Sequence, residues 1–328
     1  MQDPFFTATL LDWYAAHGRD LPWRRTHDPY AIWLSEIILQ QTRIVQGTAY
    51  WERFMARFPD VDSLAAASED EVLRLWEGLG YYSRARNLLA AARQIAARGA
   101  FPDTLVEIRA LKGVGDYTAA AIGSFAFDIP AAVVDGNVYR VLSRFYGIAT
   151  PVGTTAAKKE FTALAQALLP EKRPGDFNQA IMDFGAMQCT PASPACNDCP
   201  LAARCEALRT GRTGLLPVKK PATAVQTRPM TYVYLRCNGQ TAIRRRGPGD
   251  IWQGLWEPLT ELPAETAPRL LRSGVRHQLT HRTLIADFWL LETDVPLQLP
   301  AGYRWIPEAE LGRYAKPRLF ELLLEAIP

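Results

Sequence analysis

The sequence has no apolar run that approaches the about 20 residues a membrane-spanning helix needs. Its N-terminus lacks the basic segment and following apolar stretch of an export signal. No repeat with a period of roughly 20–50 residues is present, which argues against a solenoid. We therefore expect a cytoplasmic protein outside the membrane, and its 328 residues suffice for two domains of about 100–200 residues each.

Cysteine is also scarce, with five in the chain, but four of them fall within seventeen residues. Their pattern is Cys189-x6-Cys196-x2-Cys199-x5-Cys205, and Cys237 stands alone. Without an export signal, such a group indicates a metal or cluster site rather than a disulfide framework. A structural zinc site is the alternative, but such sites usually show two Cys-x2-Cys pairs.

The net charge of +3 is too small to indicate a nucleic-acid partner by itself. Basic residues nevertheless gather in two places. Five lie in the stretch from Arg209 to Arg228, both included, with no acid among them, and Arg244, Arg245 and Arg246 are consecutive. Either group suits a phosphate backbone, or it is ordinary solvated surface.

Composition divides the chain into two predicted domains. Helical patterns fill residues 1–210. The stretch 211–228 is rich in Gly, Thr, Pro and Lys, which predicts a linker, and 229–328 is predicted to be a smaller α+β domain. We predict helices over 29–45, 88–97, 118–125, 138–146, 156–169 and 317–326, and strands over 231–236, 241–245 and 283–292. Ser68 with Glu71 forms a capping box at a further helix start.

Three segments carry groups suited to chemistry. On the helix predicted over 29–45, Glu36 belongs to one polar stripe with Gln40 and Arg43. In 111–122, two glycines form a tight turn before a small-residue helix whose backbone N–H groups suit a phosphate oxygen, although packing alone would also explain them. Asp135 lies between an apolar tripeptide and a helix, where it caps that helix without excluding catalysis.

The hairpin at 111–122, Val134-Asp135-Gly136 and the four-cysteine loop together resemble the endonuclease III superfamily of DNA glycosylases. The resemblance implies a mostly helical helix-hairpin-helix domain that contacts DNA through Gly113, Val114 and Gly115. It also implies a [4Fe-4S] cluster bound by the four cysteines. Within the loop between the first two cysteines, 190–195 has none of the basic residues that relatives often carry, so we expect weak phosphate contact there.

Segments 34–42 and 78–88 further resemble the adenine-specific MutY family. Strand-cutting relatives carry a lysine where this chain has Tyr117, so no Schiff-base lyase step is expected. The resemblance implies that Glu36 protonates adenine N7 and that Asp135 stabilises the sugar cation. Glycoside hydrolases also use a pair of carboxyl groups in this way. Asn137 and Tyr117 would position these carboxylates.

The same resemblance implies a monomer that binds duplex DNA with adenine opposite 8-oxoguanine or guanine and flips the adenine out of the stack. Core packing is the alternative role for each side chain it assigns to DNA. The adenine pocket would consist of Trp23, Arg24, Leu39 and Gln179, and the gap in the duplex would be filled by Gln41 and Tyr81.

Segments 254–257 and 277–281 resemble parts of the family's Nudix-like domain, which recognises 8-oxoguanine. No acidic Nudix hydrolase signature is present, so this domain is expected to bind without hydrolysing. Recognition would fall to Leu279, Thr280 and His281, where the family often has Phe-Ser-His. Threonine keeps a hydroxyl, whereas leucine lacks an aromatic face for stacking.

Two other functions would share parts of this sequence pattern. A bifunctional glycosylase for pyrimidine lesions would share the fold, but Tyr117 argues against it. A DNA-binding or electron-transfer module that uses the cluster without catalysis would make Glu36 and Asp135 dispensable.

Overall fold

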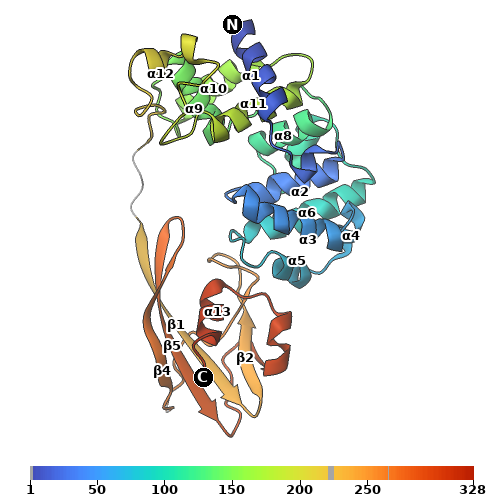
Figure 1. Cartoon of the computed structure of the whole chain (residues 1–328). Coiled ribbons are helices and arrows are strands. Elements are labelled where there is room, and N and C mark those ends of the chain that lie inside the picture. The colour runs from blue at the N-terminus through green and yellow to red at the C-terminus, as the bar shows by residue number, and fades with distance from the viewer. Residues whose placement is uncertain (1–2, 221–224, 265) are drawn as a thin grey trace. The chain divides into compact units, whose positions relative to one another are not determined.

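The structure is a computed structural model that describes residues 3–220, 225–264 and 266–328 (Figure 1). It forms two compact units. The first comprises Met1–Asp62 and Ala90–Pro221, and the second comprises Ser63–Leu89 and Ala222–Pro328. Residues 63–89 thus group with the C-terminal part of the chain. None of the described helices has the length and apolar character needed to cross a membrane.

Helices build the first unit, as predicted (Figure 1). Helices α4 (Val61–Ala66) and α6 (Ser83–Arg98) each have residues in both units, and α5 (Glu69–Leu75) belongs to the second unit. The helices of the first unit are α1 (Pro4–His17), α2 (Pro29–Leu39), α3 (Ile44–Arg57), α7 (Leu105–Ala110), α8 (Asp116–Ala126), α9 (Gly136–Tyr146), α10 (Thr155–Leu168), α11 (Pro174–Met187) and α12 (Glu206–Arg209).

Side-chain caps explain where several helices begin. Asp28 accepts a hydrogen bond from the Tyr30 N–H at 3.0 Å, and a proline follows it in the first turn of α2. The Ser68 hydroxyl accepts from the Glu71 N–H at 3.2 Å, which confirms the helix start predicted there. These local bonds fix the helix ends, while packing of their apolar faces supplies most of the stability.

One core cluster of the first unit lies where α1, α9, α10 and α11 meet. Its large members are fully or almost fully buried, and Phe6 contacts Phe145 with ring centroids 4.8 Å apart. Burial of such aromatic rings is a major stabilising contribution. The buried aromatic residues of this cluster are Phe6, Trp13, Phe145, Phe161, Phe177 and Phe184.

A mixed sheet is the centre of the second unit (Figure 1). Its order is β3-β2-β1-β5-β4, with β6 also paired to β2. Strands β1 and β5 run parallel, and the other strand pairings among the described residues are antiparallel. Helix α13 (Arg318–Leu324) contributes Phe320 to the core formed with Tyr232 and Phe288. The strands are β1 (Gln226–Cys237), β2 (Gln240–Arg245), β3 (Trp256–Glu257), β4 (Arg269–Gln278), β5 (Arg282–Thr293) and β6 (Tyr303–Pro307).

The structure corrects the predicted helix over 29–45. Helix α2 ends at Leu39 and α3 begins at Ile44, with Gln41 at a positive φ of 59° between them. A left-handed residue cannot continue a right-handed helix. Glu36, Gln40 and Arg43 therefore do not share one helical stripe. Strand β4 was not predicted, because most of its residues are exposed and it lacks an apolar alternation.

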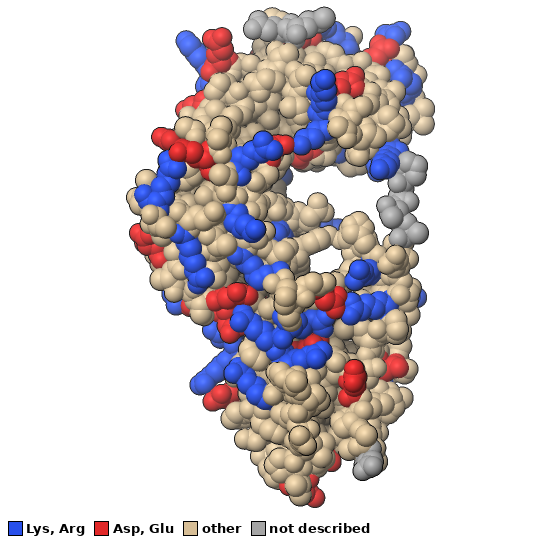
Figure 2. All heavy atoms as spheres, turned by 180° about the vertical axis from the view of Figure 1, so that it is seen from behind, with Lys and Arg blue, Asp and Glu red and all other residues tan. Residues whose placement is uncertain are grey.

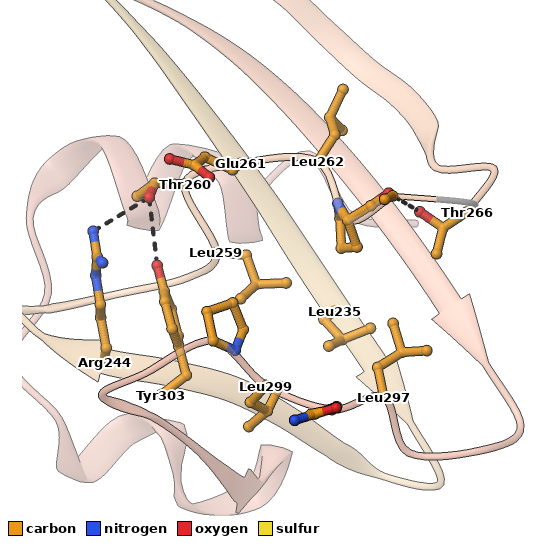
Figure 3. A pocket seen from close by; sticks show the side chains of 14 residues that line it. Leu235, Arg244, Leu259, Thr260, Glu261, Leu262, Thr266, Leu297, Leu299 and Tyr303 are labelled. Carbon is orange, nitrogen blue, oxygen red and sulfur yellow. Dashed lines mark hydrogen bonds between the residues drawn. The ribbon is translucent and has the colours of Figure 1, made fainter.

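A cavity of about 550 Å³ lies on the sheet face opposite α13 (Figure 3). The leucines Leu235, Leu259, Leu297 and Leu299 line it, and Figure 3 shows Arg244 and Tyr303 both directed at Thr260. No helix is present in the described residues between β3 and β4, so irregular chain covers this face.

Candidate active site

Glu36 is a buried carboxyl group on α2, with 8% of the residue exposed. Burial raises its pKa to about 7, and the nearby Asp135 carboxyl adds to this effect. The Arg24 guanidinium and a hydrogen bond from Tyr117 act in the opposite direction. The group therefore exchanges its proton near neutral pH, which is the property a general acid requires.

Tyr117 and Asp135 lie beside Glu36, although they come from different helices. Tyr117 is in the first turn of α8, where its hydroxyl shares a hydrogen bond with Glu36. Burial, together with the two carboxyl groups, raises the pKa of Tyr117 well above its usual value, so the phenol stays protonated. The tertiary structure thus brings together three of the residues that the sequence assigned to the reaction.

Asp135 is the N-cap of α9. Its Oδ1 accepts hydrogen bonds from the Asn137 and Val138 N–H groups, both at 2.8 Å, and its Oδ2 accepts from Asn137 Nδ2 at 2.7 Å. Burial raises the pKa of Asp135, whereas these donors and Arg140 oppose the rise because they favour the charged form. Capping and a chemical role are compatible here, since the cap fixes the carboxylate in place.

Asn137 is itself held by the surrounding chain. Its Oδ1 accepts a hydrogen bond from Arg140 Nη2 at 2.8 Å, and Arg140 Nε donates to the Cys189 carbonyl at 2.7 Å. Gly185 on α11 lies so close that a Cβ there would be 2.7 Å from the Asn137 Cβ. Asn137 thus connects Asp135 to the loop that carries the cysteines.

A cavity of about 380 Å³ adjoins Glu36. It accommodates a flat group of nucleobase size, and its walls combine apolar with polar side chains, as ligand sites typically do. All four side chains predicted to form an adenine pocket line it: Trp23, Arg24, Leu39 and Gln179.

Sequence reasoning missed two residues of this cavity region. Asp183 is completely buried and pairs with Arg24, with Nη1–Oδ2 at 2.7 Å and Nη2–Oδ1 at 2.9 Å, and also with Arg19. Tyr14 donates from its hydroxyl to Gln179 Oε1 at 2.7 Å. An acid within the apolar stretch of 181–184 was a usable signal for Asp183, because a buried charge requires a partner. Tyr14 gave no such signal.

Gln41 and Tyr81 are exposed and do not line this cavity. Both have left-handed backbones, with φ of 59° and 48°. Such a conformation costs non-glycine residues about 1–2 kcal/mol, and it occurs frequently at functional sites. Each projects from a loop within its own unit.

The hairpin turn before α8 has the predicted form. Helix α7 ends at Ala110, Gly113 has a φ of 80°, and Gly115 is the N-cap of α8 with no side-chain cap. The first N–H groups of α8 therefore lack a side-chain acceptor at the cap position. The Asp116 side chain is paired with Arg109 and Lys158 at the helix start.

The four cysteines of the predicted cluster form no disulfide, and Cys199 interacts electrostatically with the other three. Burial raises the pKa of Cys199 to about 11, and the sulfurs of Cys189, Cys205 and Cys196 add to this. Among the described residues, no three His, Cys, Asp or Glu side chains are placed to hold a single metal ion. Four cysteine sulfurs are the donor set that iron–sulfur clusters use, so the residues present fit such a group.

The arginine run is ion-paired. Arg244 Nε lies 2.8 Å from Glu257 Oε1, Arg246 also contacts Glu257, and Arg245 lies 3.1 Å from Glu69. Glu257 is buried, so Arg244 and Arg246 compensate its charge inside the second unit. On the face shown in Figure 2, Lys and Arg side chains stand among acidic ones.

Leu279, Thr280 and His281 form the turn between β4 and β5. They line a cavity of about 750 Å³ in the second unit, together with Tyr81 and Trp252. The hydroxyls of Tyr81 and Thr280 are hydrogen-bonded. The predicted 8-oxoguanine residues thus border a cavity large enough for a base.

Comparisons with known proteins agree with this architecture. Residues 34–170 match the family model described as HhH-GPD superfamily base excision DNA repair protein, and residues 231–326 match that of the NUDIX domain. The structure superposes on a thermostable thymine-DNA glycosylase with a TM-score of 0.57 and 30% identity, covering 62% of this chain and 95% of that one. An endonuclease III–DNA complex, at 21% identity and a TM-score of 0.54, shares the fold over 63% of this chain and 95% of its own.

Among curated proteins, the adenine DNA glycosylase of Mus musculus is 44% identical over 222 residues, which cover 64% of this chain but only 43% of the mouse protein. The chain thus matches less than half the length of this relative. The adenine DNA glycosylase of Buchnera aphidicola subsp. Schizaphis graminum is 35% identical over 254 residues, covering 76% of this chain and 73% of that protein. The chain therefore belongs to the adenine DNA glycosylase family of the helix-hairpin-helix base excision repair superfamily.

Proposed function

We propose that this protein is a monofunctional DNA glycosylase that hydrolyses the N-glycosidic bond of adenine opposite 8-oxoguanine or guanine in duplex DNA and so initiates base excision repair. The observation that supports it most is the buried Glu36, whose pKa is raised to about 7 at the wall of a base-sized cavity. The family relationship supplies the class of reaction. We also propose that the protein acts on DNA as a monomer and is located in the cytoplasm.

The reaction needs two carboxyl groups in different protonation states. Glu36 gives its proton to adenine N7, and the electrons of the glycosidic bond leave with the base. Asp135, supported as a carboxylate by three hydrogen bonds, stabilises the cationic sugar until water adds. Tyr117 and Asn137 hold the two carboxyl groups, and no amine stands at position 117 to cut the strand.

DNA binding in this proposal uses the open N-terminus of α8 and the turn Gly113–Gly115, where backbone N–H groups meet a phosphate. Gln41 and Tyr81 enter the duplex from their exposed loops. In the second unit, Leu279, Thr280 and His281 contact the base opposite adenine, and the Nudix-like domain binds without hydrolysing.

The four cysteines hold a [4Fe-4S] cluster in this proposal. Three of them, Cys189, Cys199 and Cys205, pack against the core of the first unit. When bound, the cluster cross-links the cysteine loop, which supplies shape rather than a chemical step. Iron and sulfide analysis of the purified protein tests this directly, with four of each expected per chain.

A thymine-specific activity is the second candidate, because a solved thymine-DNA glycosylase is 30% identical to this chain. Both candidates are tested with duplexes that carry adenine opposite 8-oxoguanine, guanine or thymine, and thymine opposite guanine. Adenine release that yields strand cleavage only after alkali, and that is lost in Glu36→Gln and Asp135→Asn, supports the proposal. Thymine release without adenine release replaces it by the second candidate, and cleavage without alkali contradicts the monofunctional assignment.

A further inference from the structure

Arg144 is a buried arginine that takes no part in the proposed reaction. It lies on α9, and 3% of it is exposed. Among the residues that the structure describes, no carboxylate forms an ion pair with it. A buried charge needs compensation from other groups, so the partners of Arg144 indicate what holds it there.

One set of partners belongs to the cysteine loop. Arg144 Nη1 donates to the Thr190 carbonyl at 2.7 Å and lies 3.4 Å from Cys189 Sγ, and Nη2 donates to the Pro191 carbonyl at 2.9 Å. The Cys205 thiol in turn donates to the Arg144 carbonyl at 3.6 Å. Arg144 therefore contacts the loop at both its first and its last cysteine.

The other partner belongs to the segment that leads towards the second domain. Arg144 Nε donates to the Leu216 carbonyl at 3.0 Å, and Leu216 is 3% exposed. Beyond it, Val152 N–H donates to the Val218 carbonyl at 2.9 Å, and Lys220 N–H donates to the Val152 carbonyl at 3.3 Å. Residues 211–220 of the predicted linker are therefore attached to the helical unit.

We infer that Arg144 is a positioning residue that couples the cysteine loop to the start of the interdomain segment, so that the state of the cluster sets how firmly residues 211–220 are held. The physical reason is that one rigid guanidinium serves both structures. Its Nη atoms can keep their hydrogen bonds to the carbonyls of 190 and 191 only while the loop is folded. Because the guanidinium is planar and rigid, the direction of its Nε–H bond is fixed by the position of the two Nη groups. A cluster bound by the four cysteines would hold their sulfurs as thiolates and place negative charge beside Arg144.

The coupling predicts a change in hydrogen exchange that does not depend on glycosylase activity. In Arg144→Gln, amides of 211–220 should exchange at least about tenfold faster, since a hydrogen bond to a charged group is lost. Arg144→Lys keeps the charge without the fork and should show a similar increase. Arg209→Gln is the control, because that exposed arginine of neighbouring α12 forms an ion pair with Glu206.

The second measurement uses the wild-type chain before and after removal of iron by oxidation and chelation. We expect faster exchange over 211–220 in the iron-free protein, while peptides of β1 and β5 remain unchanged. Equal exchange over 211–220 in both forms would overturn the coupling, as would unaltered exchange in Arg144→Gln. If Arg144→Gln does not fold, the wild-type comparison decides.

This inference rests on the proposed cluster, and the two can fail separately. Iron analysis of the untreated wild-type protein reports on the cluster alone. Protein without iron would end both the cofactor assignment and the coupling to it. If the protein contains iron but its removal does not change hydrogen exchange over 211–220, the coupling is wrong and the cofactor assignment stands.

Discussion

The Arg24 guanidinium and the Asp183 carboxylate form two parallel hydrogen bonds, 2.7 and 2.9 Å long, at the wall of the cavity beside Glu36. Burial alone would favour a neutral arginine, but the hydrogen bonds and charge of Asp183 outweigh it and raise the pKa of Arg24. The arginine therefore remains cationic, and its charge restrains the upward shift of the Glu36 pKa. Asp183 thus acts on the proposed acid through Arg24.

Asp183→Asn should destabilise the protein by about 3–5 kcal/mol, because it leaves the partly buried Arg24 and Arg19 without their counterion. Urea unfolding followed by circular dichroism measures this change. Asp20→Asn is the matched control, since Asp20 and Arg25 form an exposed pair, and it should unfold at the wild-type urea concentration. A wild-type midpoint for Asp183→Asn would contradict this account of the buried pair.

Asp135→Asn should separate capping from chemistry. Asparagine caps a helix as well as aspartate does, whereas Asp135→Ala should lose about 1 kcal/mol of stability. Both substitutions remove the charge beneath the sugar, so single-turnover adenine release should fall by about 10²–10⁴-fold in each. Thermal melting and release kinetics on the same preparations give the comparison. Near-normal release by Asp135→Asn would assign the residue to capping alone.

The rate of adenine release should fall above about pH 7, because only protonated Glu36 can donate to the base and its pKa is about 7. The expected slope is about tenfold per pH unit on the alkaline side. Single-turnover rates from pH 5.5 to 9 measure it. A rate that is flat across this range would show that another group supplies the proton.

Glu36 should also make stability depend on pH. Between the usual glutamate pKa of 4.5 and the raised pKa of about 7, the folded state keeps a proton that the unfolded state has lost, so stability decreases as pH rises through this window. The loss amounts to about 3 kcal/mol at most. Glu36→Gln lacks it, and should therefore gain stability relative to wild type between pH 5 and 8 in urea titrations. Parallel pH curves for the two proteins would refute the raised pKa.

Tyr117→Phe should move the alkaline limb of the pH–rate profile to higher pH. The hydroxyl of Tyr117 lowers the pKa of Glu36 through their hydrogen bond, so its removal lets that pKa rise further. Tyr139→Phe is the control, since that ring packs on Phe161 of α10. An unshifted limb in Tyr117→Phe would mean that the phenol does not act on Glu36.

Thr280→Val should reduce the preference for adenine opposite 8-oxoguanine over adenine opposite guanine by about tenfold, the worth of one hydrogen bond in a binding site. The substitution keeps the shape of the side chain and removes the hydroxyl that bonds Tyr81. Thr260→Val, in the separate cavity of Figure 3, should leave the ratio unchanged. If the two variants discriminate equally well, the turn over 279–281 does not read the base.

The sequence by itself determined the features that depend on local order along the chain. The helix starts at Ser68 and Asp135, the cysteine spacing and the absence of a lysine at position 117 were all readable, because caps and loop ligands act over a few residues. The resemblance of these pieces also led to the correct family and fold class.

Only the tertiary structure decided the electrostatics. The pKa of Glu36 depends on burial and on groups from 24, 117 and 135, which no pattern along α2 reveals. The break of the predicted helix between Leu39 and Ile44 and the pairing of Arg246 with Glu257 likewise depend on distant contacts. Burial and charge pairing are properties of neighbours in space, so their outcome is fixed only when the chain has folded.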